Sequence, residues 1–74
     1  MNKYPAKLVK YLNTLNADQR TEKEQLYDHT FDLAKKHGFQ SARFWAMRQI
    51  VSGLTHAQIE QKIQARIKKT RFMQ

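Results

Sequence analysis

The sequence of 74 residues contains no cysteine, one proline and two glycines. Without cysteine the chain can form no disulfide, and it lacks the thiolates that hold most structural zinc ions. A chain of this length removes only about 60% of its unfolded surface from water on folding. Such a core rarely supplies more than roughly 3–5 kcal/mol of stability without a disulfide, a metal or a second subunit. We therefore expect a thin core in one domain over residues 1–74, and a homodimer is one way to add to it.

Long apolar segments are absent as well. No apolar run exceeds the four residues from Phe44 to Met47, far below the roughly 18 that a membrane span requires. No charged, apolar and small-residue signal pattern opens the chain. We expect a soluble, cytoplasmic protein that binds no membrane.

Acidic residues are few, with six Asp and Glu against fourteen Lys and Arg and a net charge of +8. Five of the six acids lie between Asp18 and Asp32, whereas residues 33–74 hold nine Lys and Arg and the single acid Glu60. Charge distributed in this way concentrates polyanions on one side of a protein. The expected partner is nucleic acid, DNA in preference to RNA, or an acidic protein surface.

Signals for β-strands are scarce, whereas apolar residues recur at helical spacing. Leucines at four and three residues' spacing after Pro5 predict a first helix over residues 5–15. A Thr-x-x-Glu capping box at Thr21 predicts a second helix over about 21–37, with Asp18 as an alternative start. This helix places its apolar and acidic residues on opposite faces.

Two more helices follow. Ser41 can cap a third helix over 41–52, whose predicted buried stripe is Phe44, Met47 and Val51. A Thr-x-x-Gln box at Thr55 begins a fourth helix, which buries isoleucines spaced four residues apart and frays over residues 70–74. The predicted fold class is all-α, a small bundle of four short helices.

The segment between the second and third predicted helices resembles a helix-turn-helix. Ala34 supplies the small residue where the two helices cross, and Gly38 supplies the tight turn four residues later. Apolar side chains occupy the positions that bury the second helix of the motif, namely Leu33, Phe39, Phe44 and Met47. An ordinary corner between two helices of a bundle has the same features, so that alternative stays open.

The resemblance implies that residues 41–52 form a recognition helix whose first turns enter the major groove. Its predicted exposed set is Gln40, Ser41, Ala42, Arg43, Trp45, Ala46 and Gln49, in which Gln can bond adenine and Arg can bond guanine. Trp45 lies at the margin of the apolar stripe, so it belongs either to the core or to an interface. Phosphates are predicted to contact Lys35, Lys36, Arg48, Lys62, Arg66 and Lys69.

The function expected from these patterns is a small basic DNA-binding protein, a helix-turn-helix-like transcription regulator of phage, plasmid or bacterial origin. The alternative is an adaptor or inhibitor that docks its basic face on an acidic partner. We expect no enzyme, cofactor or metal, because the histidines at positions 29, 37 and 56 share no ligand spacing and no nucleophile or phosphate-loop motif occurs.

Overall fold

The computed structural model describes residues 4–72, and side chains over residues 4–69. In this part of the chain it contains no strand and four helices, α1 (Ala6–Leu12), α2 (Ala17–Lys36), α3 (Ala42–Val51) and α4 (His56–Phe72). The predicted all-α bundle of four helices is confirmed. α4 continues to Phe72, and the rest of the segment expected to fray, residues 73–74, lies outside the described residues.

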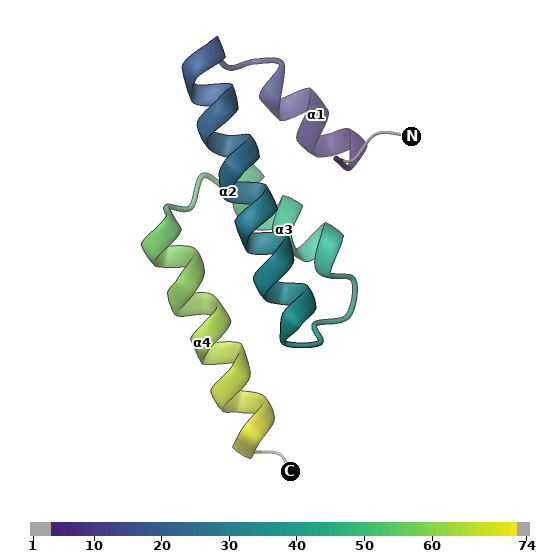
Figure 1. The fold of residues 1–74 in the computed structure, drawn as a ribbon, viewed down its shortest axis with the longest axis vertical. Helices are drawn as coiled ribbons and strands as arrows, with labels where there is room; N and C mark the ends of the chain where they lie inside the picture. The colour runs from purple at the N-terminus through teal and green to yellow at the C-terminus, as the bar shows by residue number, and fades with distance from the viewer. Residues whose placement is uncertain (1–3, 73–74) are drawn as a thin grey trace.

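The long helix α2 is the centre of the arrangement (Figure 1). It packs most extensively on α3 and also contacts α1 and α4, while α1 packs on α3. The molecule measures 43 × 27 × 16 Å along its principal axes. Because the axes of two packed helices lie about 8–10 Å apart, the shortest dimension holds two layers of helices. The thin core expected from the chain length follows from this shape.

The first two helices differ from the predicted bounds at one end each. α1 ends at Leu12, and the expected third leucine of its stripe, Leu15, packs half-buried from the following turn. α2 begins at Ala17, four residues before the predicted start at Thr21 and one before the alternative start at Asp18, because the Asn16 side chain accepts a 2.9 Å hydrogen bond from the Gln19 N–H group and caps the helix. The Thr21 hydroxyl lies inside the helix and donates to the Ala17 carbonyl.

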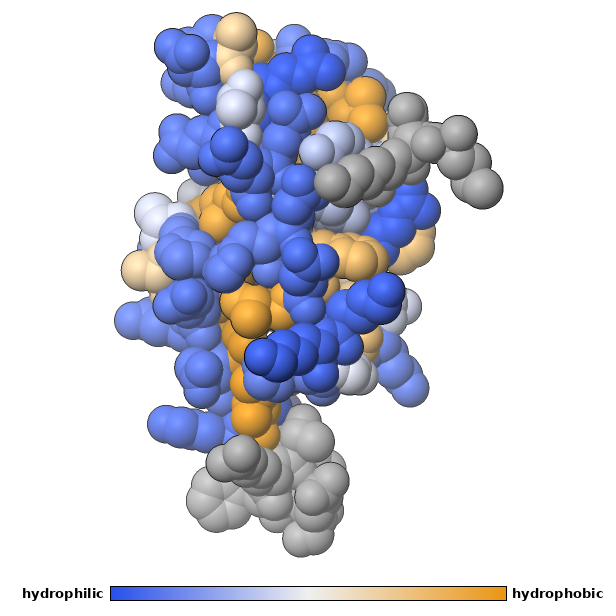
Figure 2. All heavy atoms as spheres, in the orientation of Figure 1, coloured by the Kyte–Doolittle hydropathy of each residue, from blue (hydrophilic) through white to orange (hydrophobic). Residues whose placement is uncertain are grey.

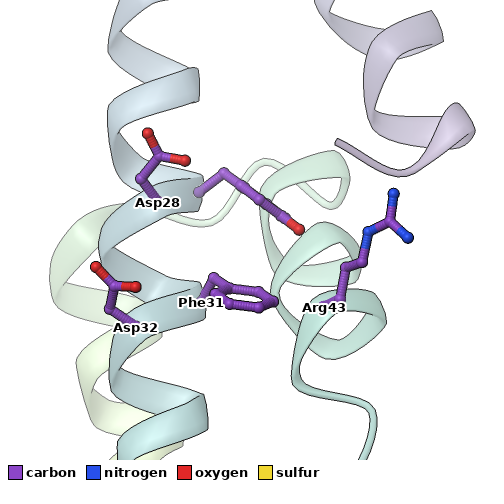
Figure 3. Close-up of a pocket in the computed structure, with 5 residues that line it drawn as sticks. Asp28, Phe31, Asp32 and Arg43 are labelled. Atoms are coloured by element: carbon purple, nitrogen blue, oxygen red, sulfur yellow. The ribbon is translucent and has the colours of Figure 1, made fainter. Parts of the chain in front are cut away.

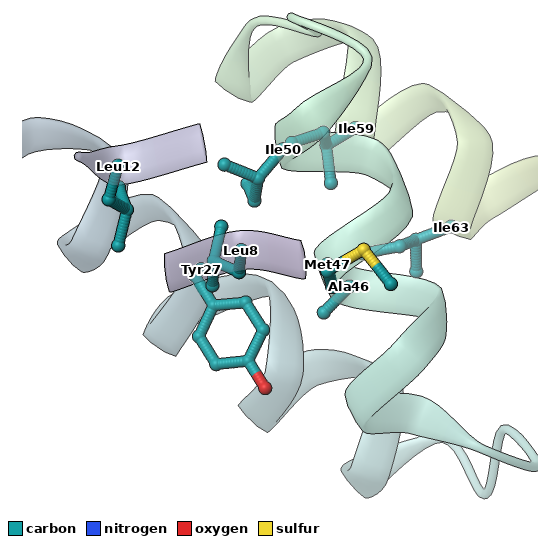
Figure 4. Packing of buried hydrophobic residues seen from close by; sticks show 8 residues of the cluster. All are labelled: Leu8, Leu12, Tyr27, Ala46, Met47, Ile50, Ile59 and Ile63. Atoms are coloured by element: carbon teal, nitrogen blue, oxygen red, sulfur yellow. The ribbon is translucent and has the colours of Figure 1, made fainter. Parts of the chain in front are cut away.

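The core gathers side chains from all four helices (Figure 4). Its buried hydrophobic members are Leu8, Leu12, Tyr27, Ala46, Met47, Ile50, Ile59 and Ile63. Burying a side chain such as Leu or Ile stabilises the fold by about 1.5–3 kcal/mol relative to leaving it exposed. The hydroxyl of the buried Thr30 keeps a partner by donating to the Leu26 carbonyl at 2.7 Å.

The capping box predicted at the start of α4 is present. The Thr55 N–H donates to the Gln58 side-chain oxygen at 2.9 Å, and the Gln58 N–H donates to the Thr55 hydroxyl at 3.2 Å. Ile59 and Ile63 are then buried and Ile67 is half-buried. Figure 2 shows an apolar strip among hydrophilic side chains over the lower halves of α2 and α4. The isoleucine stripe therefore docks α4 as its spacing predicted.

Candidate nucleic-acid interface

The predicted bend between α2 and α3 is confirmed. Gly38 adopts a φ of 75°, and its N–H donates to the Lys35 carbonyl at 3.0 Å. The Phe39 N–H donates to the Ala34 carbonyl at 2.9 Å. This pair of hydrogen bonds forms a Schellman ending, in which a left-handed residue reverses the chain and satisfies the last carbonyls of the helix. Ala34, the predicted crossing residue, is fully buried.

The second helix of the pair is rotated from the predicted orientation, although Met47 is buried as the stripe predicted. Ala46 is fully buried and Gln49 is 7% exposed, so neither belongs to an exposed recognition face. The Gln49 side-chain N–H group donates to the Trp45 carbonyl at 3.1 Å. Phe44 and Val51, expected in the core, are 52% and 39% exposed. The predicted DNA-reading face of α3 is therefore wrong at positions 46 and 49.

The cause of the different rotation is helix packing. Ala34 on α2 and Ala46 on α3 are both fully buried, and small side chains let two helices approach closely. Ile50, one turn after Ala46, joins the core with Ala46. The larger Phe44 is left on the solvent side. Hydrophobicity alone favoured Phe44 as a core residue, whereas the close α2–α3 contact favours the alanine face.

The corner residues before α3 do not act as predicted. Ser41 precedes the helix in a left-handed conformation, with φ 52° and ψ 43°, and its side chain makes no capping hydrogen bond. The predicted Ser41 cap is wrong, although its carbonyl accepts from the Trp45 N–H at 2.9 Å. Gln40 and Ser41 are both exposed.

Trp45 is half-buried at the corner, as its position at the margin of the stripe allowed. Its ring meets Phe39 edge to face, with 5.1 Å between ring centroids and an interplanar angle of 83°. The guanidinium carbon of Arg66, on α4, lies 4.2 Å from the Phe39 ring centroid and 5.9 Å from that of Trp45. Arginine stacked on aromatic rings in this way is attracted by their π-electron density. These contacts connect α4 to the α2–α3 corner.

The cations of α4 lie on the same flank as this stack. Lys62, Arg66 and Lys69 follow at four and three residues, so helical geometry places them along one side of α4. Lys62 and Lys69 are exposed, and Arg66 is half-buried against the rings. The sequence contains no acid after Glu60. We call the surface formed by Trp45, Lys62, Arg66 and Lys69 the α4 surface.

Arg43 faces the acidic side of the molecule. It lines a pocket of about 200 Å³ with the α2 residues Tyr27, Asp28, Phe31 and Asp32, and Figure 3 shows it across that pocket from the two aspartates. Burial raises the pKa of the Tyr27 hydroxyl, an effect that the positive charge of Arg43 partly offsets. Arg43 and Trp45 are about 200° apart around α3, so the predicted guanine reader is not on the α4 surface.

The other predicted phosphate contacts point in several directions. Lys35 and Lys36 are exposed, and the Lys35 ammonium lies 6.0 Å from the Phe31 ring on the acidic side. Lys36 is about 100° further around α2. Arg48 is exposed on α3 and borders a different groove. The structure therefore brings together Trp45 and Arg66 and leaves most of the predicted set distributed over several faces.

The groove beside Arg48 was not predicted. It has a volume of about 540 Å³ and lies between the start of α1 and the exposed side of α3. Its apolar lining includes Phe44, Val51 and Pro5, and the cations Lys7 and Arg48 border it. The signal for it was present in the sequence, because Phe44 and Val51 share one face of α3, but that face was assigned to the core.

Comparison of the chain with protein-family models, curated proteins and solved structures finds no match. Within the described residues, none of the helices combines the length and hydropathy of a membrane span.

Proposed function

We propose that the chain binds nucleic acid, duplex DNA in preference to RNA, through the α4 surface. The observation that carries the proposal is the stacking of Arg66 on Phe39 beside Trp45. This contact joins an acid-free stretch of α4 to an aromatic corner. Cations that track the phosphate backbone bind duplex DNA without a strict sequence preference, whereas exposed aromatic rings add affinity for the unpaired bases of single strands.

The proposed mechanism is neutralisation of phosphates. Each Lys or Arg that contacts a phosphate releases condensed counterions, which makes the affinity fall as salt rises. Lys62 and Lys69 are exposed and separated by two turns of α4, a spacing of about 10 Å. The acids of α2 keep the pocket side around Asp28 and Asp32 away from the polyanion. The protein is thereby oriented on its ligand by charge.

Base reading by the first turns of α3 is not part of this proposal, because Ala46 and Gln49 are buried. A role in transcription regulation then requires a different source of sequence preference, such as the shape and deformability of the DNA. A homodimer would present two α4 surfaces and double the number of phosphate contacts. The dimer is therefore the form that we expect to bind DNA most tightly.

The test is a fluorescence-anisotropy titration of duplex DNA, single-stranded DNA and RNA between about 50 and 200 mM salt. Lys69→Ala is expected to weaken binding to all duplex sequences alike and to lower the slope of log affinity against log salt by about 0.9. Lys7→Ala is the matched control, because it removes one exposed lysine from α1 and leaves the α4 surface intact. The control keeps the parent slope.

A second variant separates charge from stacking. Arg66→Lys keeps the positive charge and removes the planar guanidinium from the Phe39 ring. We expect the slope of log affinity against log salt to equal that of the parent, because the charge is kept. The affinity is expected to fall, most strongly for single strands, because Trp45 loses the neighbouring guanidinium of Arg66. Equal slopes for the parent, the Lys69→Ala variant and the Lys7→Ala variant would disprove binding through the α4 surface.

A second candidate function is favoured by the groove between α1 and α3. Phe44 is 52% exposed there, and Lys7 and Arg48 border the apolar lining. Exposed apolar side chains with cations at their rim match an amphipathic segment that has acidic residues beside its apolar ones. In this candidate the chain is an adaptor or inhibitor for an acidic partner.

The two candidates predict opposite results from one pair of variants. Phe44→Ser is expected to abolish binding of an amphipathic helical peptide with an acidic rim and to leave duplex affinity unchanged. Lys69→Ala is expected to do the reverse. Failure of the parent protein to bind such a peptide at low salt excludes the adaptor candidate for this groove.

A further inference from the structure

Two histidines and a glutamate meet on the surface where α4 begins beside α2. The His56 Nε2 atom lies 3.4 Å from the nearest Glu60 carboxylate oxygen, and the His29 Nε2 atom lies 3.9 Å from the same oxygen. The two imidazole rings are 4.8 Å apart between centroids and inclined at 55°. One ligand atom from each of the three residues lies within 4.8 Å of the others.

Helical geometry accounts for this arrangement. His56 and Glu60 are four residues apart on α4, so they project from one face of the helix. The capping box at Thr55 and Gln58 defines the start of α4 and thus the position of His56. His29 comes from the α2 flank that also carries Leu26, and both line a shallow depression with Thr55 and His56. The cluster therefore depends on the docking of α4 against α2.

The donor set is one that zinc accepts in sites with three protein ligands. Two imidazoles and a carboxylate, with water as a fourth ligand, complete a tetrahedral Zn²⁺ site. Zinc bonds of about 2.0–2.2 Å place neighbouring donors about 3.3 Å apart. The 3.4 Å pair already has this separation, and the 3.9 Å pair is close to it. The imidazole donors of His29 and His56 lie within 4.8 Å of each other, so they reach it by rotation of these exposed side chains. Glu60 is also the single acid among residues 33–74.

We propose that His29, His56 and Glu60 bind a divalent transition-metal ion, with zinc as the reference ion, and that the bound ion holds α4 against α2. This site is independent of the α4 surface, because His56 and Glu60 lie on the flank of α4 opposite Lys62 and Lys69. The bare cluster offers only exposed ion pairs, which contribute little to stability. A metal bond across the two helices stabilises the folded state by RT ln(1 + c/Kd), where c is the free ion concentration, so the stabilisation grows with the logarithm of that concentration.

The test uses the untagged, chelator-treated chain of 74 residues, titrated with ZnCl₂ and followed by calorimetry and thermal unfolding. The expected result is one ion per chain, and a melting temperature that rises with zinc. His29→Ala, which removes the α2 ligand, is expected to weaken binding at least tenfold and to abolish the rise. His37→Ala is the matched control, because it removes an exposed histidine at the far end of α2 and is expected to bind zinc as the parent does.

Cobalt provides a second readout that does not depend on stability. Tetrahedral Co²⁺ absorbs visible light strongly, and Glu60→Gln is expected to reduce this absorption at equal metal concentration. All three ligands are exposed, so their replacement is expected to leave the fold intact. Far-UV circular dichroism of each variant checks that it is folded. Equal zinc affinity of the parent and the His29→Ala variant, or zinc binding that lowers the melting temperature, would overturn the proposal.

Discussion

The connection between α2 and α3 contains two residues with left-handed backbone, Gly38 with φ 75° and Ser41 with φ 52°. We expect Ser41→Gly to stabilise the protein and Gly38→Ala to destabilise it. A side chain at a left-handed residue costs roughly 1–2 kcal/mol, because its Cβ crowds the following carbonyl oxygen. Glycine raises the entropy of the unfolded chain at a cost of about 0.4–1 kcal/mol. The difference is a gain of about 0.5–1 kcal/mol for Ser41→Gly and a similar loss for Gly38→Ala.

The surroundings do not change this magnitude at Gly38. A Cβ placed there meets no heavy atom within 4 Å, so the cost is confined to the backbone. Gly53, at the next corner, has a φ of 79° and the same open space. Gly53→Ala is therefore a second, independent instance of the same substitution, and it is expected to lose the same amount of unfolding free energy as Gly38→Ala. A change of 1 kcal/mol moves the melting temperature of such a domain by about 4–8 °C.

Thermal unfolding followed by far-UV circular dichroism measures these shifts. Ser41→Ala provides an internal check, because the Ser41 side chain makes no capping hydrogen bond and its loss is expected to leave the melting temperature unchanged. Parent-like melting of both Gly38→Ala and Gly53→Ala, or a lower melting temperature for Ser41→Gly than for Ser41→Ala, would refute the cost assigned to left-handed backbone.

Two further predictions concern Tyr27 and Thr55. Burial raises the pKa of Tyr27 above its ordinary value near 10. The contribution of Tyr27 to stability is therefore present below pH 10 and is lost as the pH rises through the pKa of the folded state. In urea unfolding, the Tyr27→Phe variant is expected to lose less unfolding free energy above pH 10 than the parent loses. Thr55→Ala removes the capping box of α4 and is expected to lower the unfolding free energy in the same assay by about 1 kcal/mol. Thr21→Ala, inside α2, is the control with a smaller effect, and equal losses in both variants would contradict the role assigned to the cap.

Local signals predicted the helices because the residues that end and start them act over one turn. Gly38 reverses the chain through bonds to the preceding turn, and Thr55 exchanges hydrogen bonds with Gln58. Asn16 was missed as a cap because a second capping pattern followed it at Thr21. Such errors move the end of a helix and leave the fold class unchanged.

The candidate sites were harder to predict because they depend on contacts between helices. The rotation of α3 follows from the fit of Ala46 against its neighbours, which competes with the greater hydrophobicity of Phe44. The stacking of Arg66 on Phe39 joins residues far apart in the sequence. His56 and Glu60 did carry a readable four-residue spacing, but their partner His29 becomes visible only when α4 is placed beside α2.

The small thickness of the molecule, 16 Å along its shortest axis, has a consequence for its motions. α4 docks along a short apolar seam that includes Ile59 and Ile63, whereas α2 and α3 share a far more extensive contact. Segments with few tertiary contacts open at lower free energy than the core around them. Amide protons of α4 are then expected to exchange with solvent ahead of those in α2 and α3. When α4 opens in this way Arg66 separates from Phe39 and Trp45, so the α4 surface exists only while α4 is docked on the other helices.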